Sequence, residues 1–337
     1  MNIPSKVKNL FLALSFLYIN NSFSQGKILD FDGSGFSSFS FSNNLKETSL
    51  PVPYSPSYEN EDSSQTQRGS CEFQVYFIDV GQGDAEFIRL PNCKTVLIDG
   101  GPSASSSSKL SKFLTEHKIT SLDYVVLTHP HTDHFRGLQY VFDNLSVSNF
   151  YDTRIDNPES STLQKFRQTV LSEPGINIFY PFEGEEFQWD SQVKVKVLHS
   201  CPNYSQSSQG EILNNCSIVM KISYQNVSLL FMGDAQGETE SYIADKYGSQ
   251  LRSDVLKVGH HGSPTSSSEK FLSYVSPKLA YVEVGKNSYG HPSDATLSRI
   301  ESFGARVFRS DRDGTSLFIP GDKIFYCQYP QTSENGR

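Results

Sequence analysis

The sequence is poor in the features that mark several protein classes. Apolar residues fill 36% of the 337 positions, and about 38% when Gly replaces Tyr in the count, against roughly 45–50% in an average globular protein. There is no glycine period, no long heptad pattern and no apolar run of about 18 residues, which excludes collagen, a coiled coil and a polytopic membrane protein. Part of the chain is therefore expected to lie outside a packed core.

Positive charge is also scarce. The chain has 29 Lys and Arg against 37 Asp and Glu, and its formal net charge is -8. This balance excludes a protein that coats nucleic acid by bulk charge, because such proteins present a basic surface.

Cysteine is present without the spacing of a zinc site. None of the five cysteines forms a Cys-x-x-Cys pair. In an exported protein disulfides are allowed, and proximity favours Cys71 with Cys93 and Cys201 with Cys216, which leaves Cys327 unpaired. Other pairings remain open, because sequence does not determine connectivity.

The N-terminus has the layout of a secretory signal peptide. Lys6 and Lys8 precede an apolar run at 10–19, and small residues, Ser22 and Ser24, follow at the positions that a signal peptidase reads. We expect a signal peptide over 1–24 and a secreted or periplasmic mature chain with no integral membrane segment; the alternative is a buried first helix. Residues 25–70 are a Ser/Phe/Pro-rich low-complexity leader, either flexible or docked through its Phe side chains, and 331–337 form a polar tail.

Residues 71–330 read as one domain of alternating strands and helices. Two blocks of strands, each followed by helices, predict one sheet packed on another with helices outside. The expected helices are 109–116, 135–144, 161–171, 237–246, 269–274 and 295–303. The expected strands are 73–78, 85–90, 95–98, 124–127, 193–198, 217–224, 227–231, 255–258, 280–284, 305–308 and 316–319.

The strongest chemical signal is the run His-Pro-His-Thr-Asp-His at 129–134. It follows a buried strand, so His129 and His131 can turn to one metal while Asp133 and His134 serve a second. Imidazole and carboxylate together suit zinc, iron or manganese. The run predicts a metal site.

Later residues could complete a two-metal centre. Asp234 follows a strand and a glycine, and a carboxylate there can bridge two metals. His260 and His261 end another strand, and His291 lies in a loop before a helix. Taken singly, each also fits a turn or a helix start.

Several stretches together resemble the metallo-β-lactamase fold hydrolases, and more closely the soluble hydrolase domain of ComEC-type competence proteins. The resemblance covers about residues 72–328. Its stretches are 77–85 (Phe-Ile-Asp-Val-Gly-Gln-Gly-Asp-Ala), 97–101 (Leu-Ile-Asp-Gly-Gly), 214–217 (Asn-Asn-Cys-Ser), 231–234 (Phe-Met-Gly-Asp), 256–263 (Leu-Lys-Val-Gly-His-His-Gly-Ser) and 290–292 (Gly-His-Pro).

The resemblance implies an α/β fold, a four-layer αββα sandwich with the active site along one edge. Carried over by position, His129 and His131 bind the first metal. Asp133 and His134 bind the second, and Asp234 bridges the two. His260 is the expected last ligand of the second metal, with His261 as the alternative.

One stretch departs from the wider superfamily, which has a third first-site His where this chain has Asn214 and Asn215. An amide oxygen is a weaker and harder ligand than imidazole. The first site is therefore expected to bind its metal loosely, to prefer manganese or to be partly empty. The two amides bind metal or substrate, or they cap the following strand.

The implied mechanism uses a hydroxide bound by two divalent metals, Zn²⁺ or Mn²⁺. Asp133 and Asp234 would orient it, and His261 or His291 would stabilise charge or protonate the leaving group. Three residues are candidates for substrate binding, Asn214, Asn215 and Ser263. Three other carboxylates are expected in turns or behind the ligands, Asp79, Asp84 and Asp99.

The expected function is a secreted phosphodiesterase or nuclease, because the resembled domain acts on DNA during uptake. Lys286, Arg306, Arg309 and Arg312 would then form a local basic rim. The alternatives are hydrolysis of a small substrate (a choline-phosphate ester, lactam, lactone or thioester) and a non-enzymatic binding protein on the same scaffold.

Overall fold

The computed structural model describes residues 70–321 and 327–328. The expected signal peptide, the leader as far as residue 69 and the polar tail lie outside these residues, as does the side chain of Cys327.

The first sheet contains eight strands. In chain order they are β1 (Gln74–Phe77), β2 (Glu86–Arg89), β3 (Thr95–Ile98), β4 (Ser121–Val126), β5 (Ser146–Tyr151), β7 (Asn177–Phe179), β16 (Ser316–Phe318) and β17 (Cys327–Gln328). Their spatial order is β17-β16-β1-β2-β3-β4-β5-β7. Pairing is antiparallel from β17 to β3 and parallel from β3 to β7.

The second sheet contains seven strands and, like the first, has an antiparallel part and a parallel part. They are β8 (Glu186–Asp190), β9 (Val193–His199), β11 (Val219–Tyr224), β12 (Val227–Phe231), β13 (Val255–Lys257), β14 (Leu279–Val282) and β15 (Arg306–Arg309), in the order β15-β14-β13-β12-β11-β9-β8. Pairing is antiparallel from β8 to β12 and parallel from β12 to β15. A separate short pair joins β6 (Ile155–Asp156) to β10 (Ser205–Gln206).

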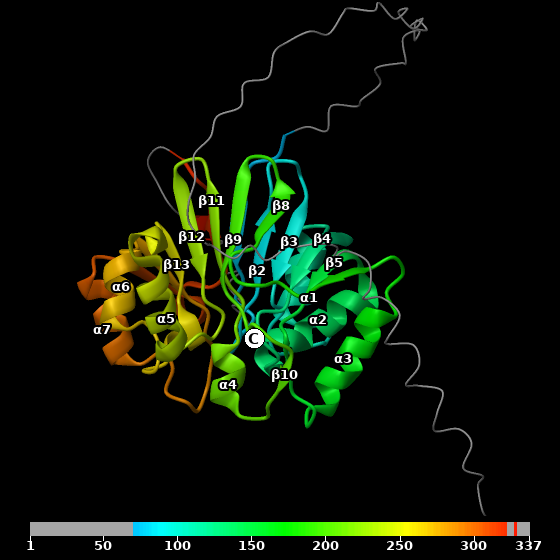
Figure 1. Cartoon of the computed structure of the whole chain (residues 1–337). Coiled ribbons are helices and arrows are strands. Elements are labelled where there is room, and N and C mark those ends of the chain that lie inside the picture. The colour runs from blue at the N-terminus through cyan, green and yellow to red at the C-terminus, as the bar shows by residue number, and fades with distance from the viewer. Residues whose placement is uncertain (1–69, 322–326, 329–337) are drawn as a thin grey trace, which may run out of the picture. The chain divides into compact units, whose positions relative to one another are not determined.

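Helices lie on the outer side of each sheet (Figure 1). The first sheet carries α1 (Lys109–Glu116), α2 (Thr132–Asn144) and α3 (Ser161–Leu171). The second carries α5 (Gly237–Tyr247), α6 (Glu269–Val275) and α7 (Asp294–Ser302). The shorter helical segments are α4 (Gly210–Asn215), α8 (Ser310–Asp313), η1 (Gly248–Leu251) and η2 (Gly259–Gly262). The four-layer αββα architecture is confirmed.

The period of two along β1 shows why the layers form. Val75 and Phe77 point into the core between the sheets, while Tyr76 between them packs on α1. The Phe77 ring stacks on Tyr281 of the second sheet with centroids 3.9 Å apart, and Tyr76 meets Phe113 of α1 edge-on at 5.2 Å. Burying each such side chain contributes about 1.5–3 kcal/mol.

The parallel halves of both sheets position the chemistry. The chain leaves β4 directly into residues 129–134, leaves β12 into Asp234 and leaves β13 into η2. The carboxyl ends of parallel strands meet at one edge, where α/β folds place their ligands. The predicted metal-binding residues are thereby brought to a shared edge.

Helix α2 differs from expectation at its start. The sequence predicted a helix from residue 135, but α2 begins at Thr132, with His131 at its N-cap. Asp133 and His134 therefore lie in the first turn of a helix. An acidic side chain there interacts favourably with the helix dipole.

Among the described residues, no helix is both long and apolar enough to cross a membrane.

Both expected disulfides are confirmed. Cys71 is joined to Cys93, and Cys201 is joined to Cys216. Cys216 is the C-cap of α4, two residues after Asn214. The second disulfide therefore fixes the end of the helix that carries Asn214.

Replacing Cys201 and Cys216 together by Ser should lower the free energy of unfolding by about 3 kcal/mol, because a closed loop of this length constrains the unfolded chain by that amount. It should also loosen metal binding through Asn214. The matched control replaces Cys71 and Cys93, which should cost similar stability without changing metal content. Urea unfolding and metal quantification measure both effects, and equal metal content in the two variants would contradict a role for the second disulfide at the site.

Candidate metal centre

The two buried histidines of the 129–134 run are held through their Nδ1 atoms. His129 Nδ1 lies 3.2 Å from Thr128 Oγ1, and His134 Nδ1 lies 2.7 Å from Asp99 Oδ2. Asp99 also accepts hydrogen bonds from the backbone and hydroxyl of Thr128. These contacts leave both Nε2 atoms facing the edge of the sandwich, as metal-binding imidazoles require.

Asp234 reaches the same point from the second sheet. The preceding Gly233 has a φ of +51°, and a Cβ there would stand 2.9 Å from Ser217 Oγ, so only glycine fits without displacing a neighbour. Ser217 Oγ accepts a hydrogen bond from Asp234 N at 3.0 Å. Asp234 is 2% exposed, and its backbone is held in place by this bond before anything binds.

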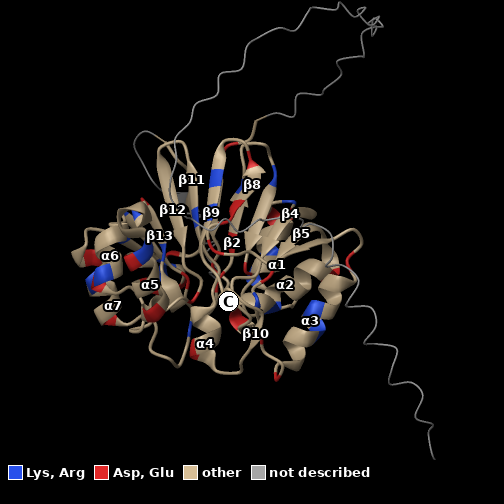
Figure 2. Ribbon diagram, in the orientation of Figure 1, with Lys and Arg blue, Asp and Glu red and all other residues tan. Residues whose placement is uncertain are grey.

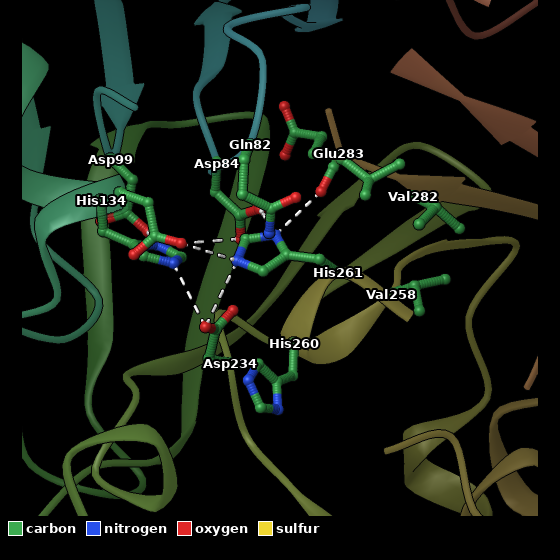
Figure 3. Close-up of polar contacts among 12 residues, drawn as sticks. Gln82, Asp84, Asp99, His134, Asp234, Val258, His260, His261, Val282 and Glu283 are labelled. Atoms are coloured by element: carbon green, nitrogen blue, oxygen red, sulfur yellow. Dashed lines mark hydrogen bonds and ion pairs between the residues drawn. The ribbon is translucent and has the colours of Figure 1, made fainter. Parts of the chain in front are cut away.

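His261, rather than its neighbour, faces these groups (Figure 3). Its Nε2 lies 3.3 Å from Asp133 Oδ2 and 3.4 Å from Asp234 Oδ2. Its Nδ1 hydrogen-bonds to the Glu283 carbonyl at 2.8 Å. His260 instead contacts Asn214 at 3.3 Å, and Figure 3 draws no contact from His260 to Asp234.

An unusual backbone makes this choice. Both His260 and His261 have positive φ, 48° and 52°, a region that non-glycine residues rarely adopt. Two consecutive left-handed residues turn the His261 ring inward, toward Asp234, and the His260 ring toward Asn214 at the cavity wall. Such strain persists where surrounding contacts enforce it, often at functional sites.

Of the overlapping groups of three side chains in this region, two that share no residue could each surround one cation. Within each group the ligand atoms lie within 4.8 Å of one another. Asp234 Oδ2 lies between the groups, 3.6 Å from His129 Nε2 and 3.3 Å from His134 Nε2. The first group is His129, His131 and Asp234, and the second is Asp133, His134 and His261.

The electrostatics of the protein groups alone favour a cation here. Burial lowers the pKa of His261, but the charges of Asp234 and Asp84 outweigh it and raise that pKa well above its ordinary value. The pKa of His134 is raised in the same way. Burial would raise the pKa of Asp133, yet its close contact with His261 Nε2 and the charges of His134 and His261 lower it to about 2. The pKa of Asp234 is lowered as well, so these two carboxylates stay ionised and require positive charge beside them.

Four buried polar atoms among the metal-binding groups show whether a metal would fit there. Asp234 Oδ1, His134 Nε2, His261 Nε2 and Asn214 Oδ1 are buried without a hydrogen-bond partner among the described residues. Unpaired buried polar atoms are costly, and imidazole, carboxylate and amide atoms are suitable ligands for Zn²⁺ or Mn²⁺. The residues fit divalent cations.

A cavity of about 600 Å³ opens onto these groups. Its described lining includes Glu211, Tyr289 and His291 but no Lys or Arg. Lys286, Arg306, Arg309 and Arg312, expected as a basic rim, are not among the lining residues. Figure 2 shows acidic and basic positions interspersed along the ribbon.

The remaining predicted residues divide between the cavity and its surroundings. Asn214 and His291 line the cavity. Asn215 turns away, where its Oδ1 accepts from Gln236 N and Thr239 Oγ1. Ser263 is buried in its own turn against Thr265.

Asp79, Asp84 and Asp99 stand behind the ligands or apart from them. Asp84 Oδ1 lies 3.1 Å from His261 Nδ1, and Asp99 supports His134. Asp79 instead pairs with Lys109.

Sequence reasoning missed a buried ionic cluster behind His261. Lys257, on β13, is 1% exposed and bonds through Nζ to Asp84. Two further buried carboxylates lie nearby, Glu86 and Glu283. A lysine between apolar residues in a buried strand, four residues before His261, was the available signal.

The family follows from a direct sequence match. A sequence model of the Metallo-beta-lactamase superfamily matches residues 78–285, a span that holds both ligand groups. The chain belongs to the metallo-β-lactamase superfamily. The resemblance inferred from the motifs is thereby confirmed, and membership supports a hydrolase that uses divalent metal.

Two curated relatives of this metallo-β-lactamase chain are competence proteins. ComE operon protein 3 of Bacillus subtilis (strain 168) is 30% identical over 282 residues, covering 77% of this chain and 35% of that protein. Competence protein ComA of Neisseria gonorrhoeae is 30% identical over 256 residues, covering 73% of this chain and 32% of that protein. The chain spans about a third of the length of these relatives. Among solved structures, CmlA, a diiron β-hydroxylase from Streptomyces venezuelae, aligns at 15% identity over 74% of this chain and 54% of that one, with a TM-score of 0.48.

Proposed function

We propose that the chain is a secreted phosphodiesterase or nuclease that works with two divalent ions, Zn²⁺ or Mn²⁺. The observation that carries the proposal is the convergence of three histidine Nε2 atoms within 3.3–3.6 Å of one carboxylate oxygen, Asp234 Oδ2. The proposal takes residues 1–24 as a signal peptide, 25–70 as a leader and 71–330 as the hydrolase domain.

The proposed ligands follow the two groups of the site. The first ion would be held by His129, His131 and Asp234, with the Asn214 oxygen as a further ligand. The second would be held by Asp133, His134 and His261, and Asp234 is close enough to contribute to both. In this assignment His261 takes the ligand position that the family resemblance assigned first to His260.

Bound ions would supply an activated water at neutral pH and positive charge for phosphoryl oxygens. The protein residues orient the reactants. Asp133 and Asp234 would accept hydrogen bonds from the attacking water and fix its direction. His291 lines the cavity with Nδ1 buried and without a partner among the described residues, where it can bind the leaving oxygen.

Asn214 favours phosphodiester chemistry over acyl chemistry. Its oxygen replaces an imidazole beside His131, which makes the first group richer in oxygen and better suited to a harder ion such as Mn²⁺. The competence proteins among the relatives motivate DNA as the substrate. The absence of Lys and Arg from the described cavity lining favours short segments over long duplexes, because long DNA is bound largely through phosphate contacts.

A substrate panel with metal quantification tests the proposal. The purified protein should bind about two ions per chain. It should cleave bis(4-nitrophenyl) phosphate and single-stranded DNA, lose this activity with a chelator and regain it with Mn²⁺ or Zn²⁺. Hydrolysis of nitrocefin, an acyl-homoserine lactone or a glutathione thioester without diester cleavage would replace the phosphodiesterase by an acyl hydrolase. Cleavage of only a choline-phosphate ester would indicate a small-substrate esterase, and absence of bound metal would favour a binding protein.

The assignment of His261 is tested against its neighbour. Replacing His261 by Ala should remove about one ion per chain and lower diester turnover by more than roughly 100-fold, since even groups behind metal ligands contribute 10–100-fold. Replacing His260 by Ala should leave metal content unchanged. The reverse pattern in metal content would return the ligand role to His260.

A further inference from the structure

The loop from Gly285 to His291 carries an exposed aromatic ring at the mouth of the cavity. Tyr289 is 73% exposed, the highest value among the large hydrophobic side chains of the described residues, and it lines the cavity that opens onto the metal-binding groups. A large aromatic surface left in water beside a polar site is a candidate contact for a ligand.

A single side chain holds this loop in shape. Asn287 Nδ2 donates to the carbonyls of Gly285 and His291 at 2.9 and 2.8 Å. Asn287 Oδ1 accepts from the backbone N–H groups of Tyr289 and His291 at 3.0 and 3.1 Å. Because all four bonds are made inside the loop, the backbone that carries the ring is ordered before binding, which lowers the cost of ordering at binding.

Aromatic rings continue from Tyr289 toward the metal-binding groups. The rings of Tyr289 and His291 have centroids 5.7 Å apart and planes inclined by 32°. His291 meets His260 edge-on at 5.1 Å, and His260 contacts Asn214. In a ligand whose phosphate lies at Asp234, the part that extends toward the cavity mouth therefore passes beside these rings.

The cavity has few positive charges, so the aromatic rings have to contribute to ligand affinity. Its described lining offers Glu211 but no Lys or Arg to contact further phosphates. A polyanion thus gains little from charge beyond the ions, and stacking has to provide the remaining affinity. Nucleobases stack on aromatic side chains irrespective of sequence.

Resting on the proposed phosphodiesterase activity, we infer that Tyr289 is a stacking platform for the nucleobase next to the scissile phosphate. The substrate class is then a nucleoside-bearing phosphodiester presented as a single strand or a free end, since a base inside a duplex cannot reach the ring.

Two chromogenic esters separate base recognition from chemistry. Thymidine 5′-(4-nitrophenyl phosphate) carries a base, and methyl 4-nitrophenyl phosphate does not. Replacing Tyr289 by Ala should raise KM for the thymidine ester about 10-fold or more, as loss of one base–aromatic stack does elsewhere, and leave the methyl ester unchanged. Tyr289→Phe should restore the wild-type KM. The matched control is Tyr274→Ala, which removes an exposed aromatic residue of α6 that is not among the lining residues.

A binding measurement makes the result independent of turnover. Calorimetry on the metal-reconstituted protein compares thymidine 5′-monophosphate, methyl phosphate and phosphocholine. The inference requires that Tyr289→Ala weakens only the thymidine nucleotide. Equal weakening of all three, no weakening, or selective loss of phosphocholine would overturn it. Failure of wild-type protein to hydrolyse either ester, with the selective binding retained, would overturn the phosphodiesterase and leave the stacking platform standing.

Discussion

Replacing Asp234 by Asn is expected to abolish diester turnover and to release bound metal. The substitution keeps the shape of the side chain but removes the charge that three histidines share, and its Nδ2 would direct hydrogens at imidazole nitrogens or at a cation. Loss of a residue proposed to contact both ions should weaken metal binding by more than roughly 100-fold, because supporting residues alone contribute 10–100-fold. Metal content per chain and the rate on bis(4-nitrophenyl) phosphate measure the two effects.

The matched control for this substitution is Asp245→Asn. Asp245 lies on α5, is exposed and pairs with Lys270 at 2.6 Å. Its replacement should change the free energy of unfolding by no more than about 0.5 kcal/mol and leave activity intact. An Asp234→Asn protein with normal metal content and normal rate would remove Asp234 from the mechanism. Normal metal content with lost turnover would restrict it to orienting the reactants.

Replacing Lys257 by Met is expected to destabilise the fold by about 3–5 kcal/mol, the cost of breaking a buried ion pair by removing one partner. Lys257 Nζ bonds to Asp84 and to the Val258 carbonyl, and lies 3.9 Å from Glu283 Oε2. Burial and the charge of Asp84 raise the pKa of Glu283 to about 8. With the ammonium gone, Asp84 is left as a buried anion. Urea unfolding measures the loss.

An exposed lysine supplies the control for this second prediction. Lys278 pairs with Asp254 at 2.8 Å, and its side chain is 64% exposed. Lys278→Met should cost at most about 1 kcal/mol, as exposed pairs do. Metal affinity separates the two further, because Asp84 supports His261 and its disturbance should weaken metal binding by roughly 10–100-fold in the Lys257 variant alone. Equal, small losses in the two variants would show that the cluster is not an essential ion pair.

Much of the fold could be predicted because its pattern is local. The helices at 109–116 and 161–171 and the strand at 227–231 were expected with the observed bounds, since periodicity and capping residues mark them. Strands β5, β7 and β8 and helix α4 were not expected. Several of these are short, and their exposed positions dilute the alternation that reveals a strand.

The candidate site was predictable in its residues but not in its details. Residues 129–134 and Asp234 could be found from the sequence, because they are His and Asp residues, the types that bind metals, and because they follow predicted strands. The choice between His260 and His261 depends on two consecutive positive φ angles, which no local residue preference indicates. Asn215 and Ser263 were candidates by motif alone, and their side chains are used in hydrogen bonds within the protein.

Each ligand group takes members from both sheets. His129 and His131 leave β4 of the first sheet, while their partner Asp234 leaves β12 of the second, and Asp133 and His134 are joined by His261 in the same way. A folding intermediate with one sheet formed would hold two members or one member of each group, and no complete group. Both ligand groups in this architecture are therefore completed in a single step, when the two sheets dock.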